Sequence, residues 1–243
     1  MIADDDRSPT RATAGALGAA VLVGSLAAYA MPALAAALPA LRAPLGIDDR
    51  TRDGRGYALT FDDGPHAQGT PAVLELLAEA GAAATFFLVG EQVQRNPALA
   101  REIVAAGHAI GLHCQRHRNL LRLAPWHVRA DIDRAQSAIE DATGLTPTLY
   151  RPPYGVLNTA ALSVARARGW RTVLWTQWGR DWERSATPDS IARLVTSGAG
   201  EGSVLLLHDA DDYSSAGSWR RTAAALPRVL ATLAERGVAP VAL

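Results

Sequence analysis

Short β-prone runs alternate with helical patterns along residues 57–243, and this alternation restricts the possible fold more than any other feature. The helical stretches have recognisable ends: residues 70–81 and 96–107 each begin with Thr or Asn before Pro and end at Gly. Strands separated by helices are typical of parallel βα units. We therefore predict one α/β domain with strands in seven places: residues 57–61, 84–89, 108–112, 148–150, 172–175, 204–207 and 239–243.

Composition limits the number of domains and the kind of partner. The chain has 243 residues, of which 49% are hydrophobic, enough for one sizeable core. The 24 basic and 24 acidic residues balance, and no long run of one sign occurs, so a nucleic-acid partner is not expected. The single cysteine, Cys114, cannot form an intramolecular disulfide, so the fold does not depend on an oxidising compartment.

The N-terminal region is strongly apolar. Residues 12–41 contain no charged side chain, and the run is long enough to cross the roughly 30 Å hydrocarbon layer of a membrane as a helix. Its length favours an uncleaved anchor, but Ala-Leu-Ala at 33–35 resembles the cleavage site of a secretory signal, which is the alternative. We predict a cytoplasmic stub with a membrane anchor or signal segment over 1–41, a polar linker over 42–55 and a folded domain over 56–243.

Acidic, imidazole and guanidinium side chains follow the ends of predicted strands. In parallel α/β folds the carboxyl ends of the strands meet at one edge, where sites are built. Two histidines four residues apart can bind one cation, and a carboxylate from another strand completes a three-ligand site with positions left open for water and substrate. Of two adjacent carboxylates, one should bind the metal and the other act as a base, because consecutive side chains diverge. These residues are Asp62, Asp63, His113, His117, Arg151 and His208.

Five motifs resemble, in order, those of the polysaccharide deacetylase family, the NodB-homology domain of carbohydrate esterases. They are TFDDGP at 60–65, HCQRH at 113–117, RPPYG at 151–155, RDW at 180–182 and LLLHD at 205–209. The resemblance implies a distorted (β/α) barrel of about seven parallel strands, preceded here by an N-terminal apolar helix. It also implies one divalent ion, most often zinc with cobalt or manganese as alternatives, and hydrolysis of N-acetyl groups on an amino-sugar polymer such as chitin or peptidoglycan.

The same resemblance assigns the central chemical roles. Asp63, His113 and His117 would bind the metal, and Asp62 would be the general base that takes a proton from the attacking water. His208 would be the acid that protonates the leaving amine, a step that an amide needs far more than an ester does.

Further motif positions would support this chemistry. Arg151 would orient Asp62, while Asp181 would hold Arg151 or His208 in place. The backbone N–H of Tyr154 would stabilise the oxyanion. The residues assigned to substrate binding are Tyr154, Trp182 and Leu206.

Two positions depart from the family pattern. Cys114 replaces a Ser or Thr that follows the first metal-binding histidine, so the loop is expected to lose a bracing hydroxyl. Trp178 stands where the family usually has Asp, and either stacks on a sugar ring or covers the rim of the site. His66 and His108 are expected to have structural roles.

Three other functions compete with N-deacetylation. A carbohydrate-binding relative without catalysis is disfavoured because base, acid and all three ligands are retained. A non-haem iron oxygenase could use the same ligands, but the additional Asp and His suit hydrolysis better. An O-acetyl esterase that acts on a polysaccharide is the main alternative. The N-terminal segment places the domain in the cell envelope, outside the cytoplasm, or in the medium if a signal is cleaved.

Overall fold

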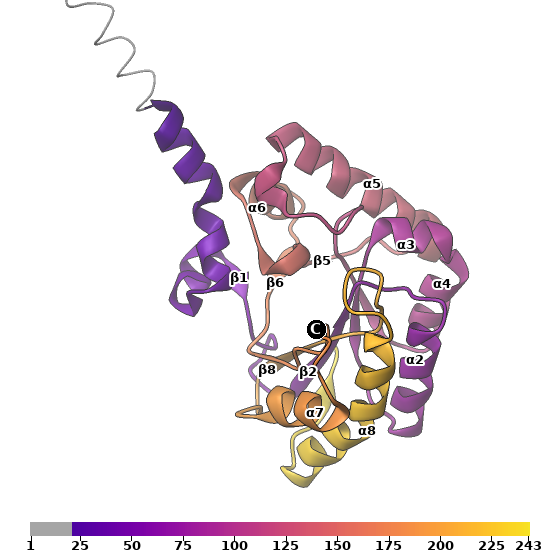
Figure 1. The fold of residues 1–243 in the computed structure, drawn as a ribbon. Coiled ribbons are helices and arrows are strands. Elements are labelled where there is room, and N and C mark those ends of the chain that lie inside the picture. Colours follow the sequence, from indigo (N-terminus) through magenta and orange to yellow (C-terminus); the bar gives the residue numbers. More distant parts are fainter. Residues whose placement is uncertain (1–20) are drawn as a thin grey trace, which may run out of the picture.

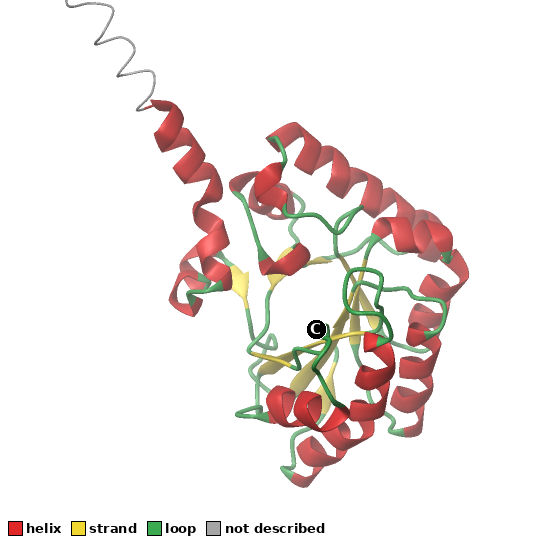
Figure 2. Ribbon diagram, in the orientation of Figure 1, coloured by secondary structure: helices red, strands yellow, loops and turns green. Residues whose placement is uncertain are grey.

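The computed structural model describes residues 21–243, so residues 12–20 of the predicted membrane segment lie outside the described part. Nine strands form one curved sheet in the order β1-β6-β5-β4-β3-β2-β8-β7, with β9 also paired to β2. All eight ladders between these strands are parallel. The sheet is strongly curved with the helices on its outer side, as in a distorted (β/α) barrel (Figures 1 and 2). The predicted fold class is confirmed.

The strands are β1 Ile47–Asp48, β2 Tyr57–Asp62, β3 Thr85–Leu88, β4 Ala109–Leu112, β5 Leu149–Tyr150, β6 Arg171–Val173, β7 Gln177–Trp178, β8 Ser203–His208 and β9 Pro240–Val241. The helices are α2 Gly69–Glu79, α3 Gly90–Arg95, α4 Pro97–Ala105, α5 Pro125–Thr143, α6 Thr159–Ala167, α7 Pro188–Thr196 and α8 Ser218–Glu235. The short 3₁₀ helices are η1 Met31–Ala36, η2 Pro39–Leu41, η3 Ala43–Leu45, η4 Leu120–Arg122 and η5 Pro153–Gly155. All seven predicted strands are present with shifted ends, and β1 and β7 are additional.

Strand β2 runs through the centre of the sheet. Every residue of its sequence YALTFD is buried, as expected for a parallel strand covered on both faces. Phe61 stacks on Phe86 of β3 with ring centroids 5.1 Å apart, which joins two neighbouring strands through their side chains. In the ladder between β2 and β8, Asp62 is the register partner of His208. Strand pairing alone therefore brings these two side chains together at the carboxyl edge.

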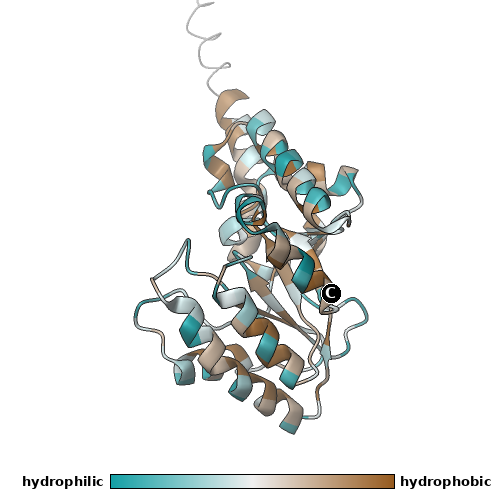
Figure 3. Ribbon diagram, turned by 90° about the vertical axis from the view of Figure 1, so that its right-hand side faces the viewer, coloured by the Kyte–Doolittle hydropathy of each residue, from teal (hydrophilic) through white to brown (hydrophobic). Residues whose placement is uncertain are grey.

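The N-terminal segment lies against the domain from about residue 28 onward. Residues 21–30 are helical and then tighten into η1, whose Pro32 and Ala35 are buried. The Tyr29 hydroxyl donates to the carbonyl of Leu123 at 2.6 Å and accepts from Asn158 Nδ2 at 2.7 Å. The helix leading away from the domain is strongly hydrophobic (Figure 3).

The described part of the predicted membrane segment is bent. Within residues 21–243 no single helix is both long and apolar enough to cross a membrane. Within the same residues, Val21–Ala36 and Pro39–Leu45 are long and apolar enough only when taken together, and the chain bends by 119° between them. The expected continuous helix is therefore interrupted where Pro32 and Pro39 enter 3₁₀ turns.

Residues 42–55, predicted as a linker, contribute to the fold. Strand β1 pairs with β6, and the buried side chain of Arg42 donates to the carbonyls of Ala35 and Trp175 at 3.0 and 2.9 Å. Arg42 also pairs with Asp49 at 2.8 Å. Part of this stretch is therefore not a free linker, although Arg50, Arg52, Asp53 and Arg55 are exposed as the polar composition predicts.

Candidate active site

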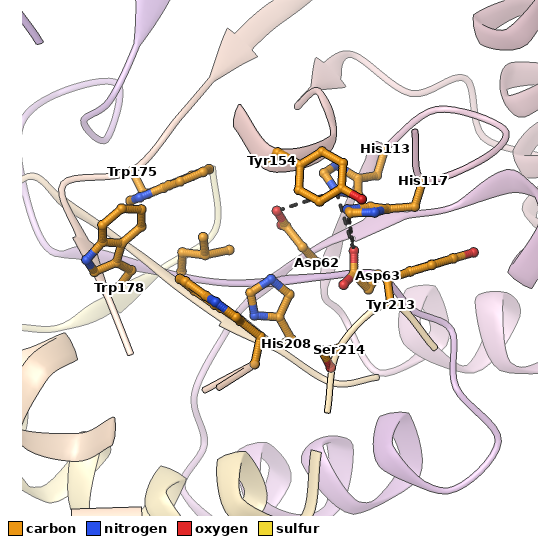
Figure 4. Close-up of a pocket in the computed structure, with 12 residues that line it drawn as sticks. Asp62, Asp63, His113, His117, Tyr154, Trp175, Trp178, His208, Tyr213 and Ser214 are labelled. Carbon is orange, nitrogen blue, oxygen red and sulfur yellow. Dashed lines mark ion pairs between the residues drawn. The ribbon is translucent and has the colours of Figure 1, made fainter. Parts of the chain in front are cut away.

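A cavity of about 240 Å³ opens at the carboxyl ends of β2, β4 and β8. It brings together predicted site residues from all five motifs, with Tyr154 of RPPYG at its rim (Figure 4). Its lining consists of Asp62, Asp63, His113, His117, Tyr154, Trp175, Trp178, Trp182, Leu206, His208, Tyr213 and Ser214. Arg151 and Asp181 lie behind this lining and are fully buried.

Three buried groups in this cavity face one another. The Oδ1 atom of Asp63 lies 3.5 Å from His113 Nε2 and 3.3 Å from His117 Nε2. His113 Nδ1 must donate to the carbonyl oxygen of Arg151, 2.7 Å away, so its Nε2 carries the lone pair when the ring is neutral. Among the described residues, Asp63 Oδ1 is buried without a hydrogen-bond partner. A carboxylate oxygen facing imidazole lone pairs fits a divalent cation, and the three side chains form a possible metal site.

Electrostatics keep these ligands in the states that bind metal. Burial alone would raise the pKa of Asp63, but the neighbouring imidazoles of His113, His117 and His208, which become cationic as the pH falls, hold that pKa well below its usual range. Burial lowers the pKa of His117 to about 4, against the opposing effect of Asp63. At neutral pH the carboxylate is therefore ionised and the His117 ring is neutral.

The neighbouring carboxylate, Asp62, has a different partner. Its Oδ1 atom accepts from Arg151 Nη1 at 2.7 Å, and the same nitrogen donates to the hydroxyl of Thr60 at 2.8 Å. The Arg151 side chain is completely buried, donates from Nε to the carbonyl of Val173 at 3.0 Å, and lies over the ring of Phe87 at 4.0 Å. This fixed guanidinium holds one oxygen of Asp62 and leaves Oδ2 facing the cavity, 3.8 Å from His113 Nε2.

On the opposite side of the cavity, His208 is held by Asp181. Asp181 accepts from the His208 backbone N–H at 2.7 Å, from His208 Nδ1 at 2.9 Å and from the Thr222 hydroxyl at 2.8 Å. Burial by itself lowers the pKa of His208, but the Asp181 charge and hydrogen bond, with smaller contributions from Asp63 and Asp62, raise it to about 10. His208 is therefore protonated at neutral pH, with Nε2 free to donate.

Aromatic side chains continue the wall beyond His208. Trp182 meets the His208 ring edge-on with centroids 5.5 Å apart, and Trp178 meets Trp182 in a similar way at 5.7 Å. Leu206 is 3% exposed and lines the same cavity. The structure thus places Trp182 and Leu206 where a small apolar group could be enclosed.

Tyr154 lies on the rim nearest the histidines. Its backbone has φ of 60°, in the left-handed region, inside η5. Among the described residues, no acceptor is found for its backbone N–H. Its ring contacts His117 edge-on with centroids 4.4 Å apart.

Known proteins are similar to this chain in sequence and in fold. A family profile described as polysaccharide deacetylase matches residues 49–173, slightly more than half of the chain. The peptidoglycan-N-acetylglucosamine deacetylase of Bacillus cereus is 38% identical over 182 residues, which cover 74% of this chain and 82% of that protein. The chain belongs to the polysaccharide deacetylase family. Its class is therefore that of hydrolases acting on carbon–nitrogen bonds.

Two further proteins show the extent of the likeness. The chitooligosaccharide deacetylase of Azorhizobium caulinodans is 37% identical over 196 residues, 78% of this chain and 93% of that protein. The crystal structure of the Bc1960 peptidoglycan N-acetylglucosamine deacetylase, in complex with 4-naphthalen-1-yl-N-oxidanyl-benzamide, aligns with a TM-score of 0.75 at 29% identity. That alignment covers 82% of this chain and 91% of the crystallised one.

The two departures from the deacetylase family pattern lie in different surroundings. Cys114 is buried beside His113, with Sγ 3.5 Å from the hydroxyl of Tyr150, and burial raises its pKa far above the ordinary range. Its thiol is therefore protonated and unreactive. Trp178 is 44% exposed on the cavity rim, where its ring is accessible to a ligand.

Three residues of this deacetylase site were not predicted from the sequence. Trp175, Tyr213 and Ser214 line the cavity outside the family motifs. Tyr213 comes from the loop that follows β8, five residues after His208, and its ring stacks on His117 with centroids 4.6 Å apart. Position in the loop after a site-bearing strand is the one sequence signal that could have indicated it.

A second His and Asp group lies beside the site. His66 Nε2 is 3.3 Å from Asp211 Oδ1, and Asp212 lies close to both. His66 Nδ1 accepts from the Gly69 N–H at 2.9 Å, and Asp211 Oδ2 accepts from the Gly217 N–H at 2.6 Å. These atoms already have protein partners, so the group braces the loop after β8 and the start of α2.

Proposed function

We propose that this protein removes N-acetyl groups from amino sugars of an envelope glycan, with the aid of one divalent metal ion. One observation carries the proposal: a buried three-ligand group lies in the same cavity as an arginine-held carboxylate and a protonated imidazole. The relatives named for peptidoglycan and chitooligosaccharides support a polymer or oligomer of N-acetylated sugars as the substrate class.

The ligand set favours zinc. Two imidazole nitrogens and one carboxylate, from His113, His117 and Asp63, suit zinc and leave open positions, while cobalt and manganese are alternatives. When bound there, the ion would polarise the acetyl carbonyl and lower the pKa of a water molecule toward neutrality.

The residues of the chain perform the proton transfers. Arg151 holds Oδ1 of Asp62, so Oδ2 is free to accept a proton from the attacking water. The water oxygen forms a bond to the acetyl carbon, and the Tyr154 N–H would donate to the oxyanion that results. The acetyl methyl group would lie against Trp182 and Leu206.

Collapse of the tetrahedral intermediate requires an acid. The Nδ1–H of His208 donates a hydrogen bond to Asp181, so the proton that can be transferred to substrate is the one on Nε2. The raised pKa of His208 keeps that proton in place at neutral pH. Transfer of this proton to nitrogen accompanies cleavage of the C–N bond and releases acetate and a free amine. A protonated imidazole is what an amine leaving group needs, and this favours N-deacetylation over O-deacetylation.

We also propose that the catalytic domain is tethered to a membrane, outside the cytoplasm, by the segment near residues 12–41. Apolar side chains at Val21, Leu22, Val23 and Leu26 are exposed in the described part of this segment. The docking of residues 28–35 on the domain supports an uncleaved tether, because Ala35 at the potential cleavage site is fully buried. Full-length chain in the membrane fraction after salt extraction is expected, whereas a mature form beginning near Ala36 in the medium would contradict it.

The activity is tested by acetate release from a panel of N-acetylated and O-acetylated glycans. Protein reconstituted with zinc should release acetate from N-acetylated oligomers, and chelation should abolish the release until zinc, cobalt or manganese is added. Release from O-acetylated glycans alone would replace the proposal with a polysaccharide esterase.

A further inference from the structure

The two histidines of the possible metal site are held in different ways. His113 is oriented by its Nδ1 hydrogen bond to the carbonyl of Arg151. His117 has no such bond, because among the described residues its buried Nδ1 atom lacks a hydrogen-bond partner. Metal-binding histidines usually donate from the second nitrogen to a fixed acceptor, which sets the orientation of the ring. Another contact must therefore orient His117.

Tyr213 stacks face to face on that ring. The Tyr213 and His117 rings are nearly parallel, with an interplanar angle of 16° and centroids 4.6 Å apart. Tyr154 meets the same imidazole edge-on, at an angle of 66°. The three rings lie together in Figure 4, with Nε2 of His117 directed toward Asp63. Turning the imidazole about its Cβ–Cγ bond would break the parallel stack.

Tyr213 is itself fixed by the protein. Its hydroxyl donates to Glu91 Oε1 at 2.6 Å and accepts from Gln92 Nε2 at 3.1 Å, both near the start of α3. The backbone of its loop is held where the Ser215 N–H donates to the carbonyl of Trp182 at 3.2 Å. A ring tethered at both ends can act as a rigid support for its neighbour.

We infer that the Tyr213 ring is a positioning residue for His117, and does by stacking what the Arg151 carbonyl does for His113 by a hydrogen bond. The inference rests on the proposed metal-dependent function, because it assigns His117 to a bound ion. Loss of a group that orients a metal ligand typically weakens metal binding about 10- to 100-fold. Removal of the ring should therefore lower zinc affinity by a factor in that range, and a variant that keeps the ring should lose less.

The test compares Tyr213→Ala and Tyr213→Phe with a matched control, Trp178→Ala. Trp178 is an aromatic wall residue of the same cavity that contacts Trp175 and Trp182, not the histidines. Zinc affinity is measured by competition with a chromophoric chelator, and the visible spectrum of the cobalt-loaded protein reports the geometry around the ion. Thermal unfolding of each metal-free variant checks that the fold is retained.

We expect Tyr213→Ala to lose about 10-fold or more in zinc affinity and to change the cobalt spectrum. Tyr213→Phe keeps the stacked ring but not the hydroxyl bonds to Glu91 and Gln92, so its loss should be clearly smaller, and Trp178→Ala should stay within about 3-fold of the parent. Wild-type affinity and spectrum in Tyr213→Ala would overturn the inference. Equal losses in Tyr213→Phe and Tyr213→Ala would also overturn it, because the hydroxyl and not the ring would then be responsible. A parent protein that binds zinc without releasing acetate would contradict the proposed function but leave this test intact.

Discussion

The proposed metal-binding half and the proposed acid half of the cavity differ in how far the protein satisfies its own polar groups. Around His208, both oxygens of Asp181 accept hydrogen bonds, three in all, from His208 and Thr222. Around His117, the described residues leave Asp63 Oδ1 and His117 Nδ1 without partners. Buried polar atoms without partners cost stability, so a site that keeps them is built for something that binds there. Asp63 Oδ1, which faces Nε2 of both histidines, is the atom that the proposed ion would satisfy, whereas the proposed acid half already has partners for both oxygens of Asp181.

Asp62 lies between the two halves and shows why adjacent carboxylates can have different roles. Asp62 is paired with a buried guanidinium, whereas Asp63 points at two imidazole nitrogens. The backbone makes this divergence possible, because Asp63 has φ of 80° and turns away from the strand that ends at Asp62. Substitutions that affect one half only can therefore test the comparison.

Asp63→Asn should have the largest effect. The amide removes the negative charge that draws a cation to the site, so metal binding and acetate release should both fall to background. Elemental analysis of the purified variant, with His208→Ala as a metal-retaining control, measures the loss. A variant that kept its full metal content would mean that Asp63 is not a ligand.

Asp62→Asn should keep the metal and lose most of the turnover. The side chain is nearly isosteric but cannot accept the proton of water, and loss of general-base help typically costs about 10²–10⁴-fold in kcat. Metal content and kcat measured on the same preparation separate the two effects. An empty site in this variant, beside a filled one in Asp63→Asn, would require the two roles to be exchanged.

His208→Ala should depend on the leaving group. With an N-acetyl sugar, kcat should fall about 10²-fold or more, because the amine leaves without a proton. With an activated acetate ester the loss should be at least about tenfold smaller, since that leaving group needs little protonation. Equal losses on the two substrates, compared side by side, would argue against an acid role.

Asp181→Asn should have the smallest effect and alter the pH profile. In the parent, kcat should fall as the pH rises through the His208 pKa, because the deprotonated ring can no longer act as an acid. That pKa should lie at or below about 10, since a bound cation would oppose the contribution of Asp63 to raising it. Without the Asp181 charge, burial lowers that pKa, so the alkaline limb should move to lower pH. The same interaction affects folding. Because Asp181 raises the His208 pKa from 6.5 to about 10, the ion pair of His208 and Asp181 contributes its full stabilisation below about pH 6.5. That contribution is lost as the pH rises through about 10. A profile of kcat against pH that matches the parent would contradict this assignment.

Strand runs and motif residues could be predicted from the sequence, and contacts between distant loops could not. Strand β2 is a largely apolar, β-prone run, and Asp62 and His208 each end such a run, so the local pattern places each of them at the end of a strand. Strands β1 and β7 have two residues each, too few to show a period. The stacking of Tyr213 on His117 joins two loops 96 positions apart, and nothing local to either residue encodes it.

The docking of the N-terminal segment is another contact between distant parts of the chain that the local sequence does not predict. Its apolar composition is evident from the sequence, but its docking depends on Tyr29 meeting Asn158 and Leu123 at the start of α6 and the end of η4. The hydrophobicity of a segment predicts that its side chains are removed from water, but it does not say whether they pack against lipid or against protein.

The most direct test of the central claim, that the metal half is incomplete without one ion, is a titration of metal-free protein with zinc while acetate release from an N-acetylglucosamine oligomer is followed. Activity should be absent at the start, rise in proportion to added zinc and level off at about one ion per chain, as a single three-ligand site requires. Full acetate release by the metal-free protein, unchanged on addition of zinc, would contradict the account.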